Sequence, residues 1–329
     1  MRIMLALATT CLTMVSPAQS WAQAGDSSAQ RYPDRPIRLI TPSAPGGGAD
    51  ILSRVIAQKM TESFGQQVVV DNRPAATGVI GTDIVAKSIP NGYTLLMAYS
   101  AHAVNVSLFS KLPFDAIKDF SAVTLCASAP YILVVNPAVQ MRSVKDLIAQ
   151  ARSKPGQLNY ASAGNGTSPH LAMELFKSMA KVNITGVPYI GGPATIVATL
   201  SGETPMTFGL VAITLPHLKS GKLIGLAVTS SQRMKLTPDL PTVAEAALPG
   251  YEAVAWFGVI APAHTPAAII TKLDQELKRI MQQPDVQERL ATLGYEIIPP
   301  ATPQKFAAYI EAEIPKWAKV IKDAGIRAD

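Results

Sequence analysis

Short apolar runs alternate along the chain with longer segments whose apolar residues recur every three or four positions. The first pair predicts a strand at 37–41 and a helix at 49–64, whose apolar stripe includes Leu52, Val55 and Ile56. Further strands are predicted at 68–70 and 93–98, with a helix at 77–88 between them. This alternation is typical of βαβ units and predicts a mainly parallel sheet flanked by helices.

The same alternation restarts near residue 131. The predicted strands are 131–135, 158–162, 186–189, 205–210, 223–228 and 255–260, and the predicted helices are 143–153, 169–181 and 194–201. Thr242 and Glu245 have the spacing of a capping box for a short helix. Two more helices are expected to open at Thr265-Pro266 and Thr302-Pro303. The restart indicates an α/β protein with two lobes.

Each half carries one glycine loop between a strand and a helix. Residues 41–48 read TPSAPGGG and residues 160–167 read YASAGNGT, each before a predicted helix. We call 43–48 the first glycine loop and 162–167 the second glycine loop. Loops at the carboxyl ends of strands lie where open parallel sheets bind ligands. A helix N-terminus also attracts anions through its unpaired N–H groups, so two such loops across a cleft suit a ligand with two anionic ends.

The candidate ligand-binding residues follow from these loops. Glycines allow close approach of the backbone, and Ser43, Ser162 and Thr167 offer hydroxyl donors. Ser100 and His102 follow the strand at 93–98 and are expected at the same sheet edge, whereas Asp50 is expected to compensate the helix dipole. His170 follows the second glycine loop, where it can donate to a ligand or serve the helix start. The other loop candidates are Pro45, Gly46, Gly47, Gly48, Asn165 and Gly166.

The start of the chain reads as a secretory signal peptide. Arg2 precedes a mostly apolar stretch at 3–15, and Ala22-Gln23-Ala24 is a small-x-small cleavage pattern. We therefore expect cleavage after Ala24, with 1–24 as the signal peptide and a periplasmic mature protein. Of the two cysteines only Cys126 would remain, so no intramolecular disulfide can form.

Composition and charge exclude several functional classes. The 329 residues carry a formal charge of +6, but the basic residues are scattered, so no nucleic-acid footprint is present. The four histidines lack metal-ligand spacing, no cofactor is predicted, and neither a G-x-S-x-G elbow nor a P-loop occurs. One alternative stays open, a Rossmann-like nucleotide-using enzyme. It is suggested by Gly46–Gly48 with Asp71, although Ile51 stands where the dinucleotide fingerprint needs its last glycine.

Several motifs together resemble the Bug family of extracytoplasmic solute receptors, the binding components of tripartite tricarboxylate transporters. The family's motifs match YP at 32–33, PIRLI at 36–40, APGGGAD at 44–50, VVDNRP at 69–74, NGYTLL at 91–96, NYASAG at 159–164, DLPTVAEA at 239–246 and PGY at 249–251. The resemblance covers the whole mature chain. The sequence departs from the family at 75–78 (AATG), where family members carry more glycine.

The resemblance implies a type II periplasmic-binding-protein fold with a ligand cleft between two hinged lobes. Lobe 1 would comprise 25–128 and 252–329, and lobe 2 would comprise 129–251. Gly191, Gly192 and Phe208 would join the two loops in the cleft. The family's ligands imply an aliphatic or aromatic carboxylate or dicarboxylate. The protein would be a monomer without enzymatic activity that delivers its solute to membrane transporter subunits, or that reports the solute to a sensor kinase.

Overall fold

The structure, a computed structural model, describes residues 31–326 as strands covered by helices on both sides. The strands are β1 (Ile37–Thr41), β2 (Val68–Asn72), β3 (Thr94–Tyr99), β4 (Phe120–Val135), β5 (Asn159–Ser162), β6 (Thr185–Pro188), β7 (Met206–Leu210), β8 (Ile224–Val228), β9 (Val254–Pro262) and β10 (Glu296–Ile297). The helices are α2 (Gly48–Phe64), α3 (Val79–Ala86), α4 (Ala101–Leu108), α5 (Val144–Ser153), α6 (Ser168–Ala180), α7 (Gly191–Ser201), α8 (Val211–Lys219), α9 (Val243–Ala246), α10 (Ala267–Met281), α11 (Pro284–Thr292) and α12 (Pro303–Ala324). A short 3₁₀ turn, η1, spans Ala76–Gly78.

The main sheet has the strand order β10-β4-β9-β3-β1-β2. β1 lies between β2 and β3 and runs parallel to both, with Leu39 opposite Val70 and Leu95. Their carboxyl ends therefore meet at one edge, where the chain enters the first glycine loop after β1 and helix α4 after β3. β5 and β6 form a second parallel pair, which brings the second glycine loop to the edge of that pair.

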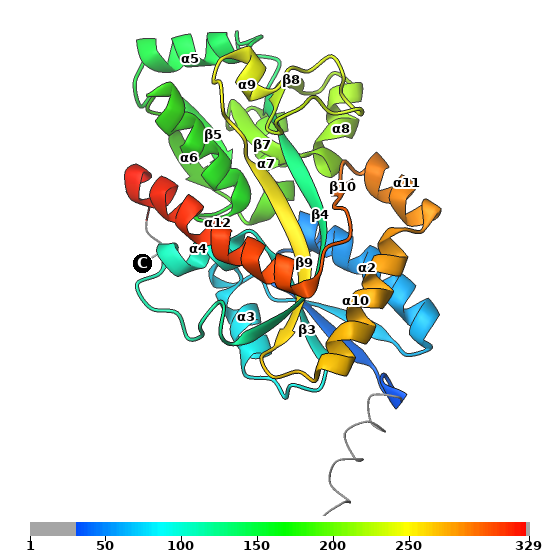
Figure 1. Cartoon of the computed structure of the whole chain (residues 1–329). Helices are drawn as coiled ribbons and strands as arrows, with labels where there is room; N and C mark the ends of the chain where they lie inside the picture. The colour runs from blue at the N-terminus through cyan, green and yellow to red at the C-terminus, as the bar shows by residue number, and fades with distance from the viewer. Residues whose placement is uncertain (1–30, 327–329) are drawn as a thin grey trace, which may run out of the picture.

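β4 and β9 connect the two halves of the molecule (Figure 1). The first part of β4 pairs with β9, and its last residues pair with β7 on one edge and with β8 on the other. Every pair that β4 or β9 makes is antiparallel, so the sheet is mixed. The prediction of a mainly parallel sheet was wrong for these pairs, because β4 and β9 pass between the halves in opposite directions.

Short sequence motifs predicted several of the remaining helices. Both bonds of the predicted capping box are present, since Thr242 Oγ1 accepts from Glu245 N and Glu245 Oε2 accepts from Thr242 N. Thr302 caps α12 as predicted. Thr265 does not cap α10, because its hydroxyl donates to Pro262 O. Helices α4, α8 and α11 and the first part of β4 were not predicted; α8 contains Pro216, which masked its helical pattern.

The buried apolar residues form one large hydrophobic cluster and three smaller ones between the sheet and the helices. Cys126 is fully buried in the large cluster as a free thiol, and burial raises the pKa of that thiol to about 12. Helix α12 buries Phe306 edge-on against Trp256, with ring centroids 5.9 Å apart. The predicted signal peptide, with Cys11 and the cleavage point at Ala24, lies outside the described residues. Between residues 31 and 326 no helix is long and apolar enough to cross a membrane.

Candidate functional site

A cavity of about 280 Å³ lies where the two glycine loops meet. Its walls come from both halves of the chain, and every lining residue is uncharged. The lining residues are Pro42, Ser43, Ala44, Gly47, Gly48, Ala49, Pro74, Thr77, Tyr99, Tyr131, Ala163, Gly164, Thr167, Ser168, Pro169, Tyr189, Ile190, Gly191, Gly192, Phe208, Leu210, Ala255 and Phe257. An anionic ligand here would be held by dipoles and hydroxyls rather than by a side-chain cation.

Three helices begin at this cavity. The N-cap of α2 is Gly47, that of α6 is Thr167 and that of α7 is Ile190, and all three residues line the cavity. Gly47 has no side chain, and neither Thr167 nor Ile190 accepts a side-chain hydrogen bond from its own helix. The N–H groups of each first turn therefore offer partial positive charge toward the cavity. This arrangement favours a ligand with more than one anionic group.

Two serine hydroxyls in the cavity wall are buried without a hydrogen-bond partner. Ser43 Oγ lies beside the start of α2, and Ser168 Oγ lies in the first turn of α6. A buried hydroxyl without a partner is costly, so such a group points to a ligand that supplies the missing bond. Burial raises the pKa of the Tyr131 phenol, and Ser168 is close enough to offset part of that rise, although no hydrogen bond of normal geometry joins the two side chains. Tyr131 is therefore neutral in the cavity wall at physiological pH.

Asp50 shapes the first glycine loop instead of facing the cavity. Its Oδ2 accepts from Gly46 N at 2.9 Å and pairs with Arg54 Nε at 3.0 Å, and its Oδ1 accepts from Asn72 Nδ2 at 2.9 Å. Burial alone would raise the pKa of Asp50, but these hydrogen bonds and the Arg54 charge hold it below its usual range. The carboxylate is thus committed to the loop. Across residues 31–326 no three histidine, cysteine or acidic side chains gather to hold a metal ion.

The middle of the cavity is apolar. Phe208 and Phe257 are buried in its wall, and Leu210 lies at the end of β7. Gly48 allows these side chains to come close, since a Cβ at Gly48 would lie 2.8 Å from Leu210 Cδ1 and 2.9 Å from Phe257 Cζ. Tyr99 adds a further ring, and its hydroxyl donates to Pro42 O at 3.2 Å. The site therefore combines an apolar centre with polar ends.

Seven of the residues predicted for the site line this cavity. They are Ser43, Gly47, Gly48, Thr167, Gly191, Gly192 and Phe208. The hydroxyl of Thr167 already donates to Gly164 O at 2.7 Å, so its proton is used within the loop. Direct contact of any of the seven with a ligand stays a prediction.

The other predicted loop residues are not among the lining residues of the cavity. Gly46 N donates to Asp50, and Gly166 N donates to His170 Nδ1 at 3.1 Å. Asn165 contributes its carbonyl oxygen to a hydrogen bond with Thr77. Pro45 and Ser162 are likewise absent from the lining residues. These five residues belong to the glycine loops but do not face the cavity.

Ser100 and His102 were predicted for the site, and the structure places them elsewhere. Helix α4 begins at Ala101, directly after β3, and neither Ser100 nor His102 lines the cavity. Ser100 Oγ accepts from Trp256 N at 3.2 Å. His102 Nε2 bonds Ala116 O at 2.8 Å, and burial lowers the pKa of His102 to about 4. Both side chains stabilise the packing of α4.

Two roles were expected for His170, donation to a ligand and support of the helix start, and its hydrogen bond in the structure fits the second. Its Nδ1 accepts from Gly166 N, and its Nε2 lies 3.7 Å from Glu174 Oε1. Burial lowers the pKa of His170, and the Glu174 charge opposes this only in part. The neutral ring therefore fixes the second glycine loop from behind.

Sequence reasoning did not select the tyrosines and several apolar residues of the cavity as ligand-binding candidates. Tyr99 and Leu210 are the last residues of β3 and β7, so their place at strand ends was a usable signal. Tyr131 and Phe257 lie within β4 and β9, and no local pattern marks them. Their position depends on where those two long strands pass the glycine loops.

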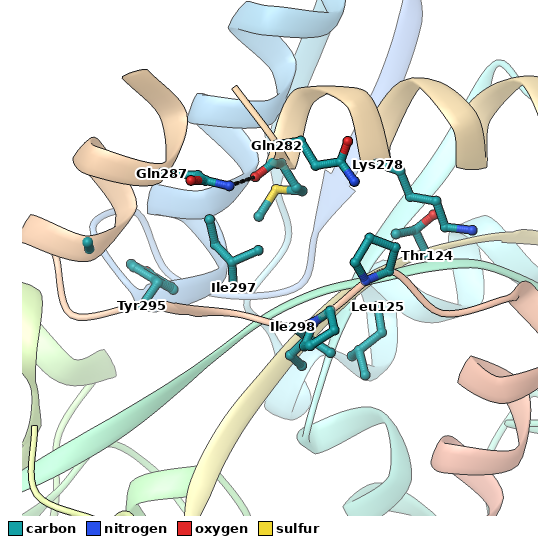
Figure 2. Close-up of a pocket in the computed structure, with 12 residues that line it drawn as sticks. Thr124, Leu125, Lys278, Gln282, Gln287, Tyr295, Ile297 and Ile298 are labelled. Atoms are coloured by element: carbon teal, nitrogen blue, oxygen red, sulfur yellow. Dashed lines mark hydrogen bonds between the residues drawn. The ribbon is translucent and has the colours of Figure 1, made fainter. Parts of the chain in front are cut away.

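A second cavity, of about 400 Å³, lies between α10, α11 and β10 (Figure 2). Lys278 in its wall already pairs with Asp274, with Nζ and Oδ2 2.6 Å apart, and Gln287 Nε2 donates to Met281 O at 3.4 Å. Lys278, Met281 and Gln282 stand at the C-terminal end of α10, where the helix dipole is negative. This larger cavity therefore disfavours anions, and the cavity at the glycine loops is the better candidate.

Comparisons with known proteins show the family to which this chain belongs. A family model described as "Tripartite tricarboxylate transporter family receptor" matches residues 52–326. The protein BugT of Bordetella pertussis is 38% identical over 302 residues, which cover 91% of this chain and 92% of BugT. The solved structure of Rpa4515 of R. palustris with adipate has a TM-score of 0.86 at 36% identity, covering 90% of this chain and 99% of that one. MatC of Rhodopseudomonas palustris with bound malate has a TM-score of 0.82 at 31% identity, covering 88% and 100%.

Proposed function

Because the chain belongs to the family of tripartite tricarboxylate transporter receptors, we propose that it captures a linear dicarboxylate in the cavity at the glycine loops. It then delivers this solute to the membrane subunits of such a transporter. The observation that carries the proposal is an uncharged cavity into which three helix N-termini and two unpartnered serine hydroxyls open.

The family and the fold class predicted from the motifs are confirmed. The α/β architecture matches solved structures of periplasmic receptors, among them one described as the periplasmic binding protein BugD. The family is one of receptors, not of enzymes. We therefore interpret the cavity as the solute-binding site of a receptor.

We assign one carboxylate of the solute to each polar end of the cavity. Ser43 and the first turn of α2 provide donors on one side, while Ser168 and the first turn of α6 provide them on the other. Helix N-termini and hydroxyl groups donate to carboxylate oxygens without a cation nearby. Such donors also let the solute leave, since no buried ion pair has to be broken on release.

The apolar centre favours an unsubstituted aliphatic linker between the carboxylates. Phe208, Leu210 and Phe257 offer no partner to a hydroxyl on that linker, and burying such a hydroxyl unpaired is costly. Adipate, the ligand of the similar Rpa4515 structure, has a linker of this kind, whereas malate carries a hydroxyl. We therefore place adipate-like dicarboxylates ahead of hydroxy acids.

The remaining features of the proposal follow from the family and the strand topology. The described residues within 25–128 and 252–329 form one lobe and 129–251 form the other, with β4 and β9 as the hinge, as their shared pairing supports. The mature protein is periplasmic after cleavage behind Ala24, acts as a monomer and catalyses no reaction. A two-lobed receptor of this kind closes on its solute, and the membrane partner recognises the closed form.

Calorimetry with a series of acids tests the proposal. Succinate, glutarate, adipate and pimelate are titrated alongside malate, with hexanoate and adipamide as controls that lack one or both carboxylates. We expect adipate or a neighbour in length to bind most tightly, malate to bind more weakly and both controls to fail. Stabilisation by ATP or NAD with no response to any carboxylate would instead support the nucleotide-using enzyme.

A further inference from the structure

Thr77 has a backbone conformation that threonine rarely adopts. Its φ of 53° and ψ of 31° lie in the left-handed region, which residues with a branched Cβ avoid because of steric crowding. Two other non-glycine residues within 31–326 have positive φ, Lys181 and His264, and neither lines the cavity. Strain of this kind persists only where the surrounding structure imposes it, and it is common at functional sites.

The hydroxyl of Thr77 links the two sides of the cavity. Thr77 Oγ1 donates to Asn165 O at 3.1 Å, although the two residues are 88 positions apart. Thr77 stands just before α3, and Asn165 belongs to the second glycine loop. Thr77 also lines the cavity itself, so this bond lies at the cavity wall.

Each partner of this bond is held in place by its own half of the chain. On one side, Asn105 Nδ2 donates to Thr77 O at 3.2 Å, and a Cβ at Gly78 would lie 2.6 Å from Pro42 O. The second glycine loop is fixed by the bond from Gly166 N to His170. Because both loops are constrained, the bond between Thr77 and Asn165 can form in only a narrow range of relative positions.

Leu108 adds an apolar contact between the same two regions. A Cβ at Gly166 would lie 2.0 Å from Leu108 Cδ2, so helix α4 lies directly on the second glycine loop. Gly166 has a φ of 73°, a conformation that suits glycine. The polar link through Thr77 is thus accompanied by close packing that excludes water on one side.

We propose that Thr77 latches the closed form of this receptor: its strained backbone conformation directs the hydroxyl to the carbonyl of Asn165 once the lobes meet. Glycine at this position would relieve the strain but remove the latch. The inference rests on the proposed function, since a closed form matters only to a receptor that encloses its solute.

The first test measures the fraction of ligand-free protein in the closed form, because a bond from Thr77 to Asn165 stabilises that form whether or not a solute is bound. Spin labels are placed at Lys87→Cys in the loop after α3 and at Val197→Cys on α7, both exposed, while Cys126 is buried. Distances between the labels are then compared for the unchanged chain and for the T77S, T77A and T77G variants. We expect T77A and T77G to shift the population to longer distances and T77S to keep the original distribution.

The second test measures adipate affinity by calorimetry in the same variants. Loss of one hydrogen bond at the cavity mouth, where water competes, should weaken binding about threefold in T77A and T77G but not in T77S. The matched control is Thr292→Ala, which removes a hydroxyl bond to Arg289 O far from the cavity and should change neither readout.

The two tests separate the inference from the proposed function. If the unchanged chain binds no dicarboxylate, the proposed function fails, while the label distances still decide whether Thr77 latches the loops. Identical distance distributions in all four chains would overturn the latch. A shift in T77S as large as that in T77A would also overturn it, because the hydroxyl would then not be the cause.

Discussion

Removing the hydroxyl of Ser43 should affect the free and the bound protein in opposite directions. In the free protein Ser43 Oγ is buried without a partner, so Ser43→Ala removes an unsatisfied group and should leave the free energy of unfolding unchanged or raise it by up to about 1 kcal/mol. In the bound protein the same change deletes a hydrogen bond to a carboxylate. Bonds to charged groups contribute about 1.5–3 kcal/mol, which corresponds to affinity about 10- to 150-fold weaker.

The assay combines urea unfolding of the free protein with calorimetric titration of adipate. The matched control is Ser53→Ala on α2, the helix that follows Ser43, because Ser53 Oγ is buried but accepts from Thr41 Oγ1 at 2.8 Å. That variant should lose about 1 kcal/mol of stability and keep its affinity. A Ser43→Ala protein that loses stability but binds adipate normally would refute the reasoning, since Ser43 would then be an ordinary structural hydroxyl.

Three further predictions concern the cavity, a buried histidine and the free thiol. Gly48→Ala places a Cβ within 2.9 Å of Leu210 and Phe257, so adipate affinity by calorimetry should fall at least about tenfold, and normal binding would contradict the assigned cavity. His102 has its pKa lowered from 6.5 to about 4, so the folded state resists protonation and stability is lost as pH falls from 6.5 to 4. The loss reaches about 3 kcal/mol by urea unfolding, and a His102→Gln variant with an equally steep pH dependence would contradict it. Cys126 should react slowly with a thiol reagent until urea unfolds the chain, and equal rates in both states would contradict its burial.

Patterns of neighbouring residues correctly predicted the elements whose formation depends on those residues alone. The strand Ile37–Thr41 and the capping box at Thr242 follow from residues adjacent in sequence, and both were found as predicted. The antiparallel pairing of β4 was not predicted, because the stretch from Phe120 to Pro130 has no regular alternation of apolar and polar residues.

The same distinction applies to the site. Ser43 and Gly48 could be selected because a glycine loop at a strand end is visible in the sequence. His102 was misplaced because α4 begins immediately after β3, with no turn signal between them. Tyr131 and Phe257 reach the cavity through the path of β4 and β9 across the molecule, a property of tertiary structure.

A crystal structure of the protein with adipate tests the central claim most directly. The account predicts one carboxylate at Ser43 Oγ and the first turn of α2, the other at Ser168 Oγ and the first turn of α6, and the aliphatic chain against Phe208 and Phe257. Adipate bound between α10 and α11, or an empty cavity at the glycine loops in saturating adipate, would contradict it.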